Sequence, residues 1–375
     1  MTIPLLPPPE EGTVLDRRTL NRTLLARQHL LARAPIPPSD AIEHLVALQA
    51  QNPRDPYLAL WSRLEPFDPM ALSRLVEERW AARLTLMRGT LHLVLASDAA
   101  PLRAVMQGEV TRMFRASPFR RHLDGADLDA LVARGTALVE EEPRSVAELA
   151  RVLAEQWPDR DPDSLAYAVR YLVPVVQVPP RGLWNRSGAA RVTTLRTWLG
   201  VAQLPSPDLP GLVRRYLRAF GPASVADIRV WSGLTGLRPV VERMRPSLRT
   251  YRDEEGRELV DVPDGVFADG SLDAPVRFLP EFDNVFLSHA DRSRITGDDR
   301  WDARYARKGV FLVDGFFGGA WRLAASRREP ASLAVMPMAT LDEEPRERVE
   351  AEAARLLSFL RPEDPTASVH LARSG

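Results

Sequence analysis

The sequence predicts an α+β protein in which helix-turn-helix units with two-stranded wings precede a β-rich C-terminal domain. Two stretches predict the units. After Ser145, and again after Ser224, a short helix, a turn, a second helix and a pair of strands follow one another. Beyond Pro275 the pattern changes to short apolar runs with the spacing of strands, which predicts the C-terminal domain.

The first segment of the chain is mainly helical. Apolar spacing predicts a helix over residues 20–34 and a second helix that starts after Pro38 and is stopped by Pro53. A further helix is expected over residues 70–78, and residues 91–95 are typical of a wing-like strand.

The two repeated units can be outlined in the same way. In the first, we expect helices over 145–150 and 164–173 and a strand over 175–178 that returns at 183–184 after a Pro-Pro-Arg-Gly turn. In the second, we expect a helix from 224, a helix over 237–244, and strands over 248–252 and 258–262 around a Glu-Glu-Gly turn. Both units open with Ser-Val-Ala, which is a weak internal repeat.

The C-terminal region is expected to be rich in strands. The expected strands cover residues 276–279, 285–288, 310–314, 320–323 and 332–336. A closing helix is expected over 342–360.

Composition limits the class of protein. With 375 residues, 45% apolar and 27% charged, the chain suits several small globular domains. The absence of cysteine excludes disulfides, thiolate zinc sites and cysteine nucleophiles. The six histidines are scattered, so we expect neither a metal nor a cofactor. The sequence shows no signal peptide or membrane span, which predicts a cytoplasmic protein.

Charge is balanced overall but clustered locally. The 50 basic and 50 acidic residues cancel, yet arginines gather within 112–121, 214–218 and 292–307. A nucleic-acid-binding protein needs concentrated basic patches more than a positive total. The 292–307 stretch also interleaves Trp301 and Tyr305 with its arginines, which suits a DNA groove. Its acidic residues leave a solvated loop as an equal alternative.

Four stretches together carry a resemblance to a known family. They are Leu20-Asn21-Arg22 with the following Leu24-Leu25-Ala26-Arg27-Gln28, Leu48-Gln49-Ala50-Gln51-Asn52-Pro53 with Tyr57-Leu58-Ala59-Leu60-Trp61, Arg88-Gly89-Thr90-Leu91-His92-Leu93-Val94, and Leu279-Pro280-Glu281-Phe282-Asp283. In this order, and spanning most of the chain, they resemble the AlkZ/YcaQ-like winged-helix DNA glycosylases of the azinomycin-resistance type.

The resemblance implies a domain plan. It gives three tandem winged-helix units, at residues 14–125, 126–203 and 204–270, followed by a β-rich domain over 271–375. It also implies hydrolysis of the N-glycosidic bond of N-alkylated purines, including bulky adducts and interstrand crosslinks made by DNA-alkylating natural products.

The resemblance places the catalytic motif at Gln49 and Gln51, in the Gln-x-Gln version of the self-resistance branch. Residues at i and i+2 lie about 200° apart on an ideal helix, so both cannot face one pocket from within it. We expect Gln49 on the last turn of a helix that ends before Pro53, with Gln51 on the departing chain. The alternative for both glutamines is two polar residues at a frayed helix end.

Glutamine cannot act as a general base, but its amide can hold a water molecule and its dipole can stabilise a developing positive sugar. This suffices only for a leaving group that is already activated, such as a cationic N3- or N7-alkylated purine. Strand cleavage through a Schiff base needs an amine. The only amines are Lys308 and the N-terminus, both remote from the motif in sequence, so we expect no lyase activity.

Other residues are candidates for supporting roles. The DNA-binding candidates are Asn52, Arg54, Arg88, His92, Arg292, Arg294, Arg300 and Arg304, and the auxiliary catalytic candidates are Glu281 and Asp283. Each has a structural alternative. His92 can be a buried hydrogen-bonded histidine, Arg88 can pair a core carboxylate, and Glu281 and Asp283 can cap a turn after Pro280.

The expected partner is double-stranded DNA containing alkylated purines, bound by a monomer associated with the nucleoid. The main alternative is a non-catalytic winged-helix DNA-binding protein, either a regulator or a binder of drug adducts. A small-molecule hydrolase lacks support, because the chain has no Gly-x-Ser-x-Gly, P-loop or dinucleotide-binding fingerprint.

Overall fold

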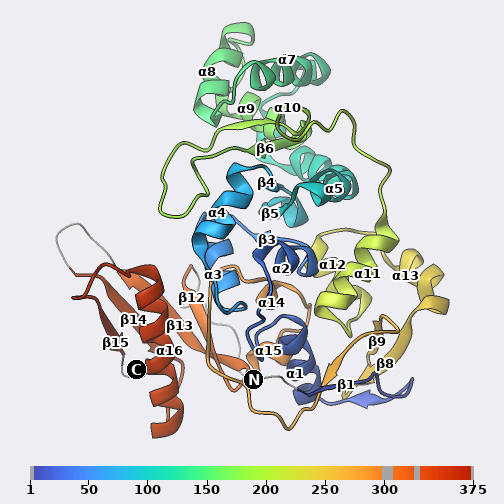
Figure 1. Ribbon diagram of the computed structural model, residues 1–375. Coiled ribbons are helices and arrows are strands. Elements are labelled where there is room, and N and C mark those ends of the chain that lie inside the picture. Colours follow the sequence, from blue (N-terminus) through green and yellow to red (C-terminus); the bar gives the residue numbers. More distant parts are fainter. Residues whose placement is uncertain (1–3, 298–306, 325–329, 373–375) are drawn as a thin grey trace.

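The computed structural model describes residues 4–297, 307–324 and 330–372. It confirms a mixed α+β chain, as the sequence predicts. The helices α7 to α9 lie at one end of the molecule and the C-terminal sheet with α16 at the other (Figure 1). Within the described residues, no helix is both long and apolar enough to span a membrane.

The N-terminal segment supplies short helices around the site. They are α1 (Arg17–Arg27), α2 (Pro38–His44), α3 (Asp55–Trp61) and α4 (Pro69–Glu77). Asp16 caps α1 and Asp68 caps α4, each by accepting a hydrogen bond from a backbone N–H of the first turn. The first helix thus ends several residues before the expected boundary at Ala34.

A five-stranded sheet joins this segment to the next one. Its order is β3-β5-β4-β6-β7, with β3 (Leu48–Gln49), β4 (Ala81–Thr85), β5 (Leu91–Leu95), β6 (Val175–Gln177) and β7 (Val192–Thr194). Every adjacent pair is antiparallel. The expected return strand at 183–184 is wrong, because the loop after β6 is longer than the Pro-Pro-Arg-Gly turn requires and the partner strand is β7.

The next helices are η1 (Met87–Gly89), α5 (Ala96–Ala116), α6 (Pro118–Arg121), α7 (Leu128–Glu141), α8 (Val146–Gln156), α9 (Pro162–Leu172) and α10 (Leu195–Leu199). Of these, α5 contacts the sheet at β4 and β5, and α7 and α10 contact it at β7. The Ser-Val-Ala start at Ser145 is a capping box in which Ser145 and Glu148 satisfy each other's backbone N–H groups.

The second Ser-Val-Ala start repeats this arrangement. Ser224 and Asp227 form a capping box at the start of α12. The elements here are α11 (Leu209–Phe220), α12 (Val225–Ser232), α13 (Arg238–Met244), η2 (Arg245–Ser247), β8 (Arg249–Asp253) and β9 (Glu258–Asp261). The N-terminal strands β2 (Val14–Leu15) and β1 (Leu5–Leu6) pair with β8 and with β10 (Phe267–Ala268), so the chain start is tied to this segment.

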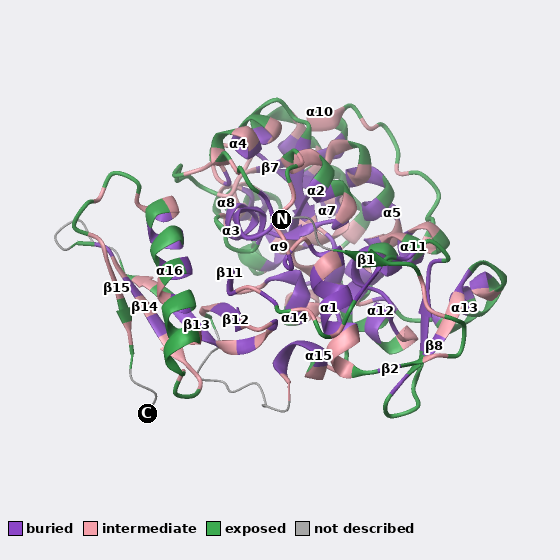
Figure 2. Ribbon diagram, turned by 60° about the horizontal axis from the view of Figure 1, so that its bottom comes forward, coloured by how far each residue is buried: buried purple, intermediate pink, exposed green. Residues whose placement is uncertain are grey.

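The C-terminal domain is a second five-stranded sheet covered by one long helix. Its strands, in sheet order, are β11 (Arg277–Leu279), β12 (Gly309–Val313), β13 (Phe316–Ala324), β14 (Ser332–Pro337) and β15 (Ser368–Leu371). The helix α16 (Glu343–Leu360) buries one face against the sheet and leaves the other exposed (Figure 2). Two short helices, α14 (Asn284–Leu287) and α15 (Ser293–Thr296), connect β11 to β12.

The strand expected over 285–288 is wrong, because these residues form α14. Asp283 caps that helix by accepting a hydrogen bond from the backbone N–H of Val285 at 3.0 Å. A four-residue apolar run does not distinguish a strand from a helical turn, and the cap decides in favour of the helix here.

Candidate functional site

Gln49 and Gln51 lie on an extended segment, so the expected helix end is wrong. α2 stops at His44, and Gln49 belongs to β3, which pairs with β5. The amide N–H of Ala50 donates to the carbonyl oxygen of Leu91 at 2.8 Å and continues the pairing. Side chains alternate along an extended chain, so residues at i and i+2 project to one side. Gln51 follows in a bend just after this pairing, and the side chains of both glutamines reach the hairpin between β4 and β5 without a frayed helix.

The amide of Gln49 is held in one orientation. Its side chain is nearly buried, at 6% exposed. Nη2 of Arg88 donates to Oε1 of Gln49 at 3.2 Å, and Nε2 of Gln49 donates to Oγ1 of Thr90 at 3.1 Å. A guanidinium can only donate, so the atom that faces Arg88 must be the carbonyl oxygen. The hydroxyl of Thr90 also lies within hydrogen-bond distance of Oε1 of Gln49, at 3.3 Å, so the second N–H of the amide is the group left for a water molecule or a substrate.

Gln51 is less constrained than its neighbour. Its residue surface is exposed, and its Oε1 accepts a hydrogen bond from the backbone N–H of Leu91 at 3.3 Å. In the part of the chain that the structure describes, its amide NH2 group has no partner. Both glutamines therefore contact the same hairpin, and Gln51 offers the free donor at the surface.

That hairpin connects β4 to β5, and a strained turn sets its shape. Arg88 has a left-handed backbone (φ 55°) and so does Gly89 (φ 68°). The left-handed backbone of Gly89 favours glycine, and a Cβ there would also lie 2.7 Å from the end of the Met113 side chain. Nη1 of Arg88 donates to the carbonyl oxygen of Trp231 at the end of α12. Strained non-glycine residues cluster at functional sites, and this one places a cation beside Gln49.

Arg88 has no carboxylate partner among the described residues, so the alternative of a core ion pair is not what the structure shows. Burial lowers its pKa to about 10, which still leaves it charged at neutral pH. A half-buried guanidinium without an acid beside it is suited to an anionic ligand.

His92 faces the protein interior. It is fully buried, and its Nδ1 donates to the carbonyl oxygen of Thr90 at 3.0 Å. Burial, helped by the charge of Arg88, lowers the pKa of His92 to about 3, so the ring is neutral. Its Nε2 atom is buried without a partner. His92 supports the hairpin and has no surface with which to touch DNA directly in this structure.

Arg83, for which the sequence predicts no role, fixes the peptide between the two glutamines. It is 1% exposed, and its Nη2 donates to the carbonyl oxygen of Ala50 at 2.7 Å. Its Nη1 donates to the carbonyl oxygen of Arg181 at 3.3 Å. A Cβ at Gly182 would lie 2.5 Å from that Nη1, so the loop approaches closely only because glycine stands there. The feature of the sequence that could have pointed to Arg83 is an arginine within a short, mainly apolar strand.

The segment Pro280–Asn284 faces Gln49 across a small hollow. Its lining residues are Leu45, Leu48, Gln49, Ala59, Arg63, Pro280, Phe282, Asp283 and Asn284. Its volume of about 10 Å³ matches a single water molecule. The fourth stretch of the resemblance therefore lies beside the second, although more than 200 residues separate them.

The two acidic candidates of this segment differ in their surroundings. Asp283 is buried and forms a two-point ion pair with Arg63, at 2.7 and 2.8 Å, besides capping α14. Glu281 is half-buried, and no hydrogen bond or ion pair engages it among the described residues. Burial raises the pKa of Glu281, while the charge of Arg307 opposes the rise. Only Glu281 keeps its carboxylate available.

Asp55 is a second residue for which the sequence predicts no role. It is 2% exposed at the start of α3, and its Oδ2 atom is buried without a hydrogen-bond partner. Burial, with repulsion from Glu281 and Asp283, raises the pKa of Asp55 to about 8. It is therefore mainly protonated at neutral pH. Its only signal in the sequence is a charged residue just before Pro56, at the start of an apolar helix.

The DNA-binding candidates are not all in one place. Asn52 and Arg54 are exposed on the loop that follows Gln51. Arg292 is exposed, whereas Arg294 is 7% exposed and donates to the carbonyl oxygen of Pro222 at 3.0 Å. Arg300 and Arg304 lie outside the described residues.

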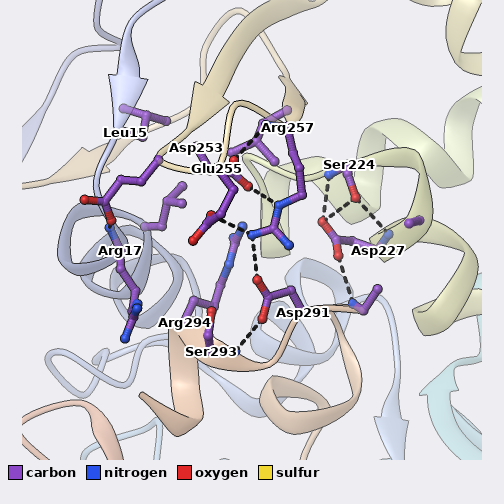
Figure 3. Close-up of a pocket in the computed structure, with 15 residues that line it drawn as sticks. Leu15, Arg17, Ser224, Asp227, Asp253, Glu255, Arg257, Asp291, Ser293 and Arg294 are labelled. Carbon is purple, nitrogen blue, oxygen red and sulfur yellow. Dashed lines mark hydrogen bonds and ion pairs between the residues drawn. The ribbon is translucent and has the colours of Figure 1, made fainter. Parts of the chain in front are cut away.

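Arg294 lines a pocket of about 100 Å³ between the β8–β9 hairpin and the segment around α15 (Figure 3). The acidic residues of its wall are Asp227, Asp253, Glu254, Glu255 and Asp291, and the arginines are Arg17, Arg257 and Arg294. Arg257 crosses the pocket and pairs with Asp253, Glu255 and Asp291. Carboxylates outnumber arginines, so this pocket does not suit a DNA phosphate. No group of three or more metal-ligating side chains occurs in the described residues.

Comparisons with known proteins identify relatives of this chain. A family model described as "DNA glycosylase AlkZ-like" matches residues 42–359. The interstrand DNA cross-link repair glycosylase of Streptomyces sahachiroi is 24% identical over 363 residues, covering 88% of this chain and 93% of that protein. The solved structure of the Streptomyces sahachiroi DNA glycosylase AlkZ superposes with a TM-score of 0.75 at 20% identity, over 96% of this chain and all of that one. The chain belongs to the AlkZ-like DNA glycosylase family.

Proposed function

We propose that this protein is a monofunctional DNA glycosylase that hydrolyses the N-glycosidic bond of cationic N7- or N3-alkylated purines. The observation that carries the proposal is that the side chains of Gln49 and Gln51 both hydrogen-bond to the β4–β5 hairpin, with a water-sized hollow beside Gln49. We assign the two amides to holding the attacking water at C1′ of the damaged nucleotide.

The chemistry needs little acid help. An alkylated purine carries a positive charge, so it accepts the electron pair of the C1′–N bond and leaves neutral. The water adds to C1′ and gives up a proton. Carbonyl dipoles of the glutamines stabilise the positive sugar while the bond breaks. Neutral bases, which lack this activation, are expected to be poor substrates.

Glu281 is the better candidate for taking the proton from the water. Its carboxylate is unengaged among the described residues, and its raised pKa brings it closer to the working pH of a base. Asp283 already neutralises Arg63, so we assign it to holding the segment in place. Protonated Asp55 beside them adds no further negative charge.

Bulky adducts and interstrand crosslinks are the substrates we favour. The relative from Streptomyces sahachiroi is named an interstrand DNA cross-link repair glycosylase. Gln51 stands at the surface rather than in a deep pocket, and a bulky crosslinked base cannot easily be flipped into an enclosed one. We infer that the lesion is attacked from the groove, within double-stranded DNA.

The remaining parts of the proposal concern the setting of the reaction. We propose that the segments 14–125, 126–203 and 204–270 act as winged-helix units that bind DNA and that the domain over 271–375 supplies Glu281. We propose a monomer in the cytoplasm, associated with the nucleoid, that requires no cofactor. Asn52, Arg54 and Arg88 are the DNA contacts we favour, since they surround the two glutamines.

Lyase activity would need the amine of Lys308 or of the N-terminus. Lys308 follows Arg307, whose charge tends to lower the pKa of Glu281. Lys308 is therefore near this part of the site in space, although it is far from Gln49 in the sequence. We nevertheless propose hydrolysis without strand cleavage, because neutral glutamines that hold a water favour attack by water. Borohydride trapping checks this: a covalent protein–DNA adduct that disappears in Lys308→Ala would contradict it.

The test is single-turnover release of N7-methylguanine from a labelled duplex, with and without alkali. We expect strand breaks only after alkali treatment. If neither this duplex nor a crosslinked one loses its base, although the protein still binds it, then a non-catalytic DNA-binding protein is the correct interpretation.

A further inference from the structure

A cleft of about 400 Å³ opens beside the Gln49–Gln51 segment, between the loop that follows it and the C-terminal domain. Its lining residues are Asn52, Arg54, Leu58, Trp321, Leu323, Leu360 and Arg361. Leu58 belongs to α3, the next two to β13, and the last two to the end of α16. Two parts of the chain, about 300 residues apart, therefore build one cleft.

The cleft brings together two arginines, Arg54 and Arg361, and none of its lining residues is acidic. Arg54 and Arg361 are close enough that the charge of Arg361, in addition to the larger effect of desolvation, lowers the pKa of Arg54. Neither guanidinium is ion-paired with a carboxylate in the described residues. The Nε atom of Arg361 is buried without a hydrogen-bond partner. Two cations that repel each other across a cleft favour an anion between them.

The nearby acidic side chains are occupied elsewhere. Asp364 accepts hydrogen bonds from the backbone N–H of Ala331 and from Thr366. Asp55 is buried and mainly protonated at neutral pH, as described above. Hydrogen bonds from Thr366 and Ala331 and, to a smaller degree, the charge of Arg361 lower the pKa of Asp364, so its carboxylate is ionised and offsets part of the charge of Arg361 without forming an ion pair with it.

We propose that this cleft holds one phosphodiester group of the DNA backbone next to the lesion, gripped by Arg54 and Arg361. The identification of the ligand as a DNA phosphate rests on the proposed function, whereas the presence of an anion-binding site rests on the two arginines alone. Guanidinium groups match phosphate geometry and bind it at two points. The side chains of Leu58, Leu323 and Leu360 line the cleft beside these arginines, and apolar surroundings strengthen a charge–charge interaction. Arg54 lies three residues after Gln51, so this grip sets the register of the lesion over the glutamines.

The salt dependence of DNA binding tests the proposal. The slope of log Kd against log salt concentration decreases by about 0.9 for each phosphate that the protein no longer neutralises. We expect this slope to decrease by about one unit in the double variant Arg54→Gln, Arg361→Gln, because both arginines hold a single phosphate. Arg361→Lys keeps the charge and is expected to keep the wild-type slope.

A matched control lies on the same helix. Arg346 and Arg348 are exposed and pair with Glu350 and Glu344 on α16, away from the cleft. Their double glutamine variant is expected to bind DNA with the wild-type slope. A wild-type slope in Arg54→Gln, Arg361→Gln, with the fold verified by circular dichroism, would overturn the phosphate site. If the slope decreases in that variant while the wild-type protein binds DNA but releases no base, the phosphate site is supported and only the glycosylase proposal fails.

Discussion

At the scale of single residues, the site combines groups that do not titrate near neutral pH with one that does. Gln49 and Gln51 are neutral, Arg88 stays charged and His92 stays neutral across the physiological range. Asp55 is the exception, because its pKa of about 8 lies close to neutral pH. The carboxyl group of Asp55 therefore couples the stability of the site to pH.

The sign of this coupling can be tested with Asp55→Asn. Between a pKa of about 4 unfolded and about 8 folded, the folded chain holds a proton that the unfolded chain lacks. Stability is therefore lost as the pH rises through this window, by at most about 1.4 kcal/mol per pH unit for one proton. Asparagine resembles the protonated acid and cannot ionise. We expect the melting temperature of Asp55→Asn to fall less than that of the wild type between pH 5 and pH 8.

An exposed acid gives the control for that comparison. Asp129 lies at the start of α7, and Asp129→Asn is expected to follow the wild-type pH dependence. Parallel melting curves for Asp55→Asn and the wild type would show that Asp55 ionises normally in the folded protein.

At the scale of elements, the sequence predicted those helices and turns that are determined by neighbouring residues. The helices expected to start at Ser145 and Ser224 and the hairpin turn at 254–256 depend only on neighbouring residues, and both helices start and the hairpin forms as expected, although the first helix continues to Gln156. The extended conformation of Gln49 could not be predicted from its neighbouring residues. After α2, Val46 adopts a left-handed backbone (φ 69°) that disfavours β-branched residues, and pairing with β5 fixes the next residues.

In the candidate site, too, residues recognisable from the sequence differ from residues that only the structure identifies. The motif itself was predicted from the sequence, but its neighbours Arg83, Asp55 and Arg63 were not. Arg83 and Arg63 act through contacts with residues far along the chain, such as Arg63 with Asp283, and the pKa of Asp55 depends on burial and on the charges of Glu281 and Asp283. A single sequence does not show which distant residues pair, because it does not distinguish a buried arginine from an arginine at the surface.

The Arg63–Asp283 pair allows a prediction that separates stability from function. Asp283→Asn leaves a buried guanidinium without its counter-ion, which typically costs about 3–5 kcal/mol. The Arg27–Asp261 pair is buried to the same degree and lies away from the glutamines. We expect Asp283→Asn and Asp261→Asn to lower the free energy of unfolding similarly, as measured by urea titration.

Only the first of these two variants is expected to slow base release, since Asp283 anchors the segment that faces Gln49. Release is measured at a temperature where both proteins remain folded. An equal decrease of activity in Asp261→Asn would mean that the effect reflects general destabilisation.

At the scale of the whole molecule, distant segments converge on the glutamines. The sheet that contains β3 joins residues of the first and second expected units, and the C-terminal domain contributes the hollow beside Gln49. α12 supplies the carbonyl that holds Arg88. The site therefore depends on the packing of all four segments, which fits a family match that extends over residues 42–359.

The central claim is that Gln49 and Gln51 together position the attacking water. The most direct measurement is single-turnover release of N7-methylguanine by Gln49→Ala and Gln51→Ala, with duplex binding measured in parallel and Gln156→Ala, on the exposed end of α8, as the control. We predict about a 100-fold slower release in each site variant, because the water loses its orientation, with unchanged DNA affinity and wild-type behaviour of the control. Wild-type release rates in both site variants would contradict the account.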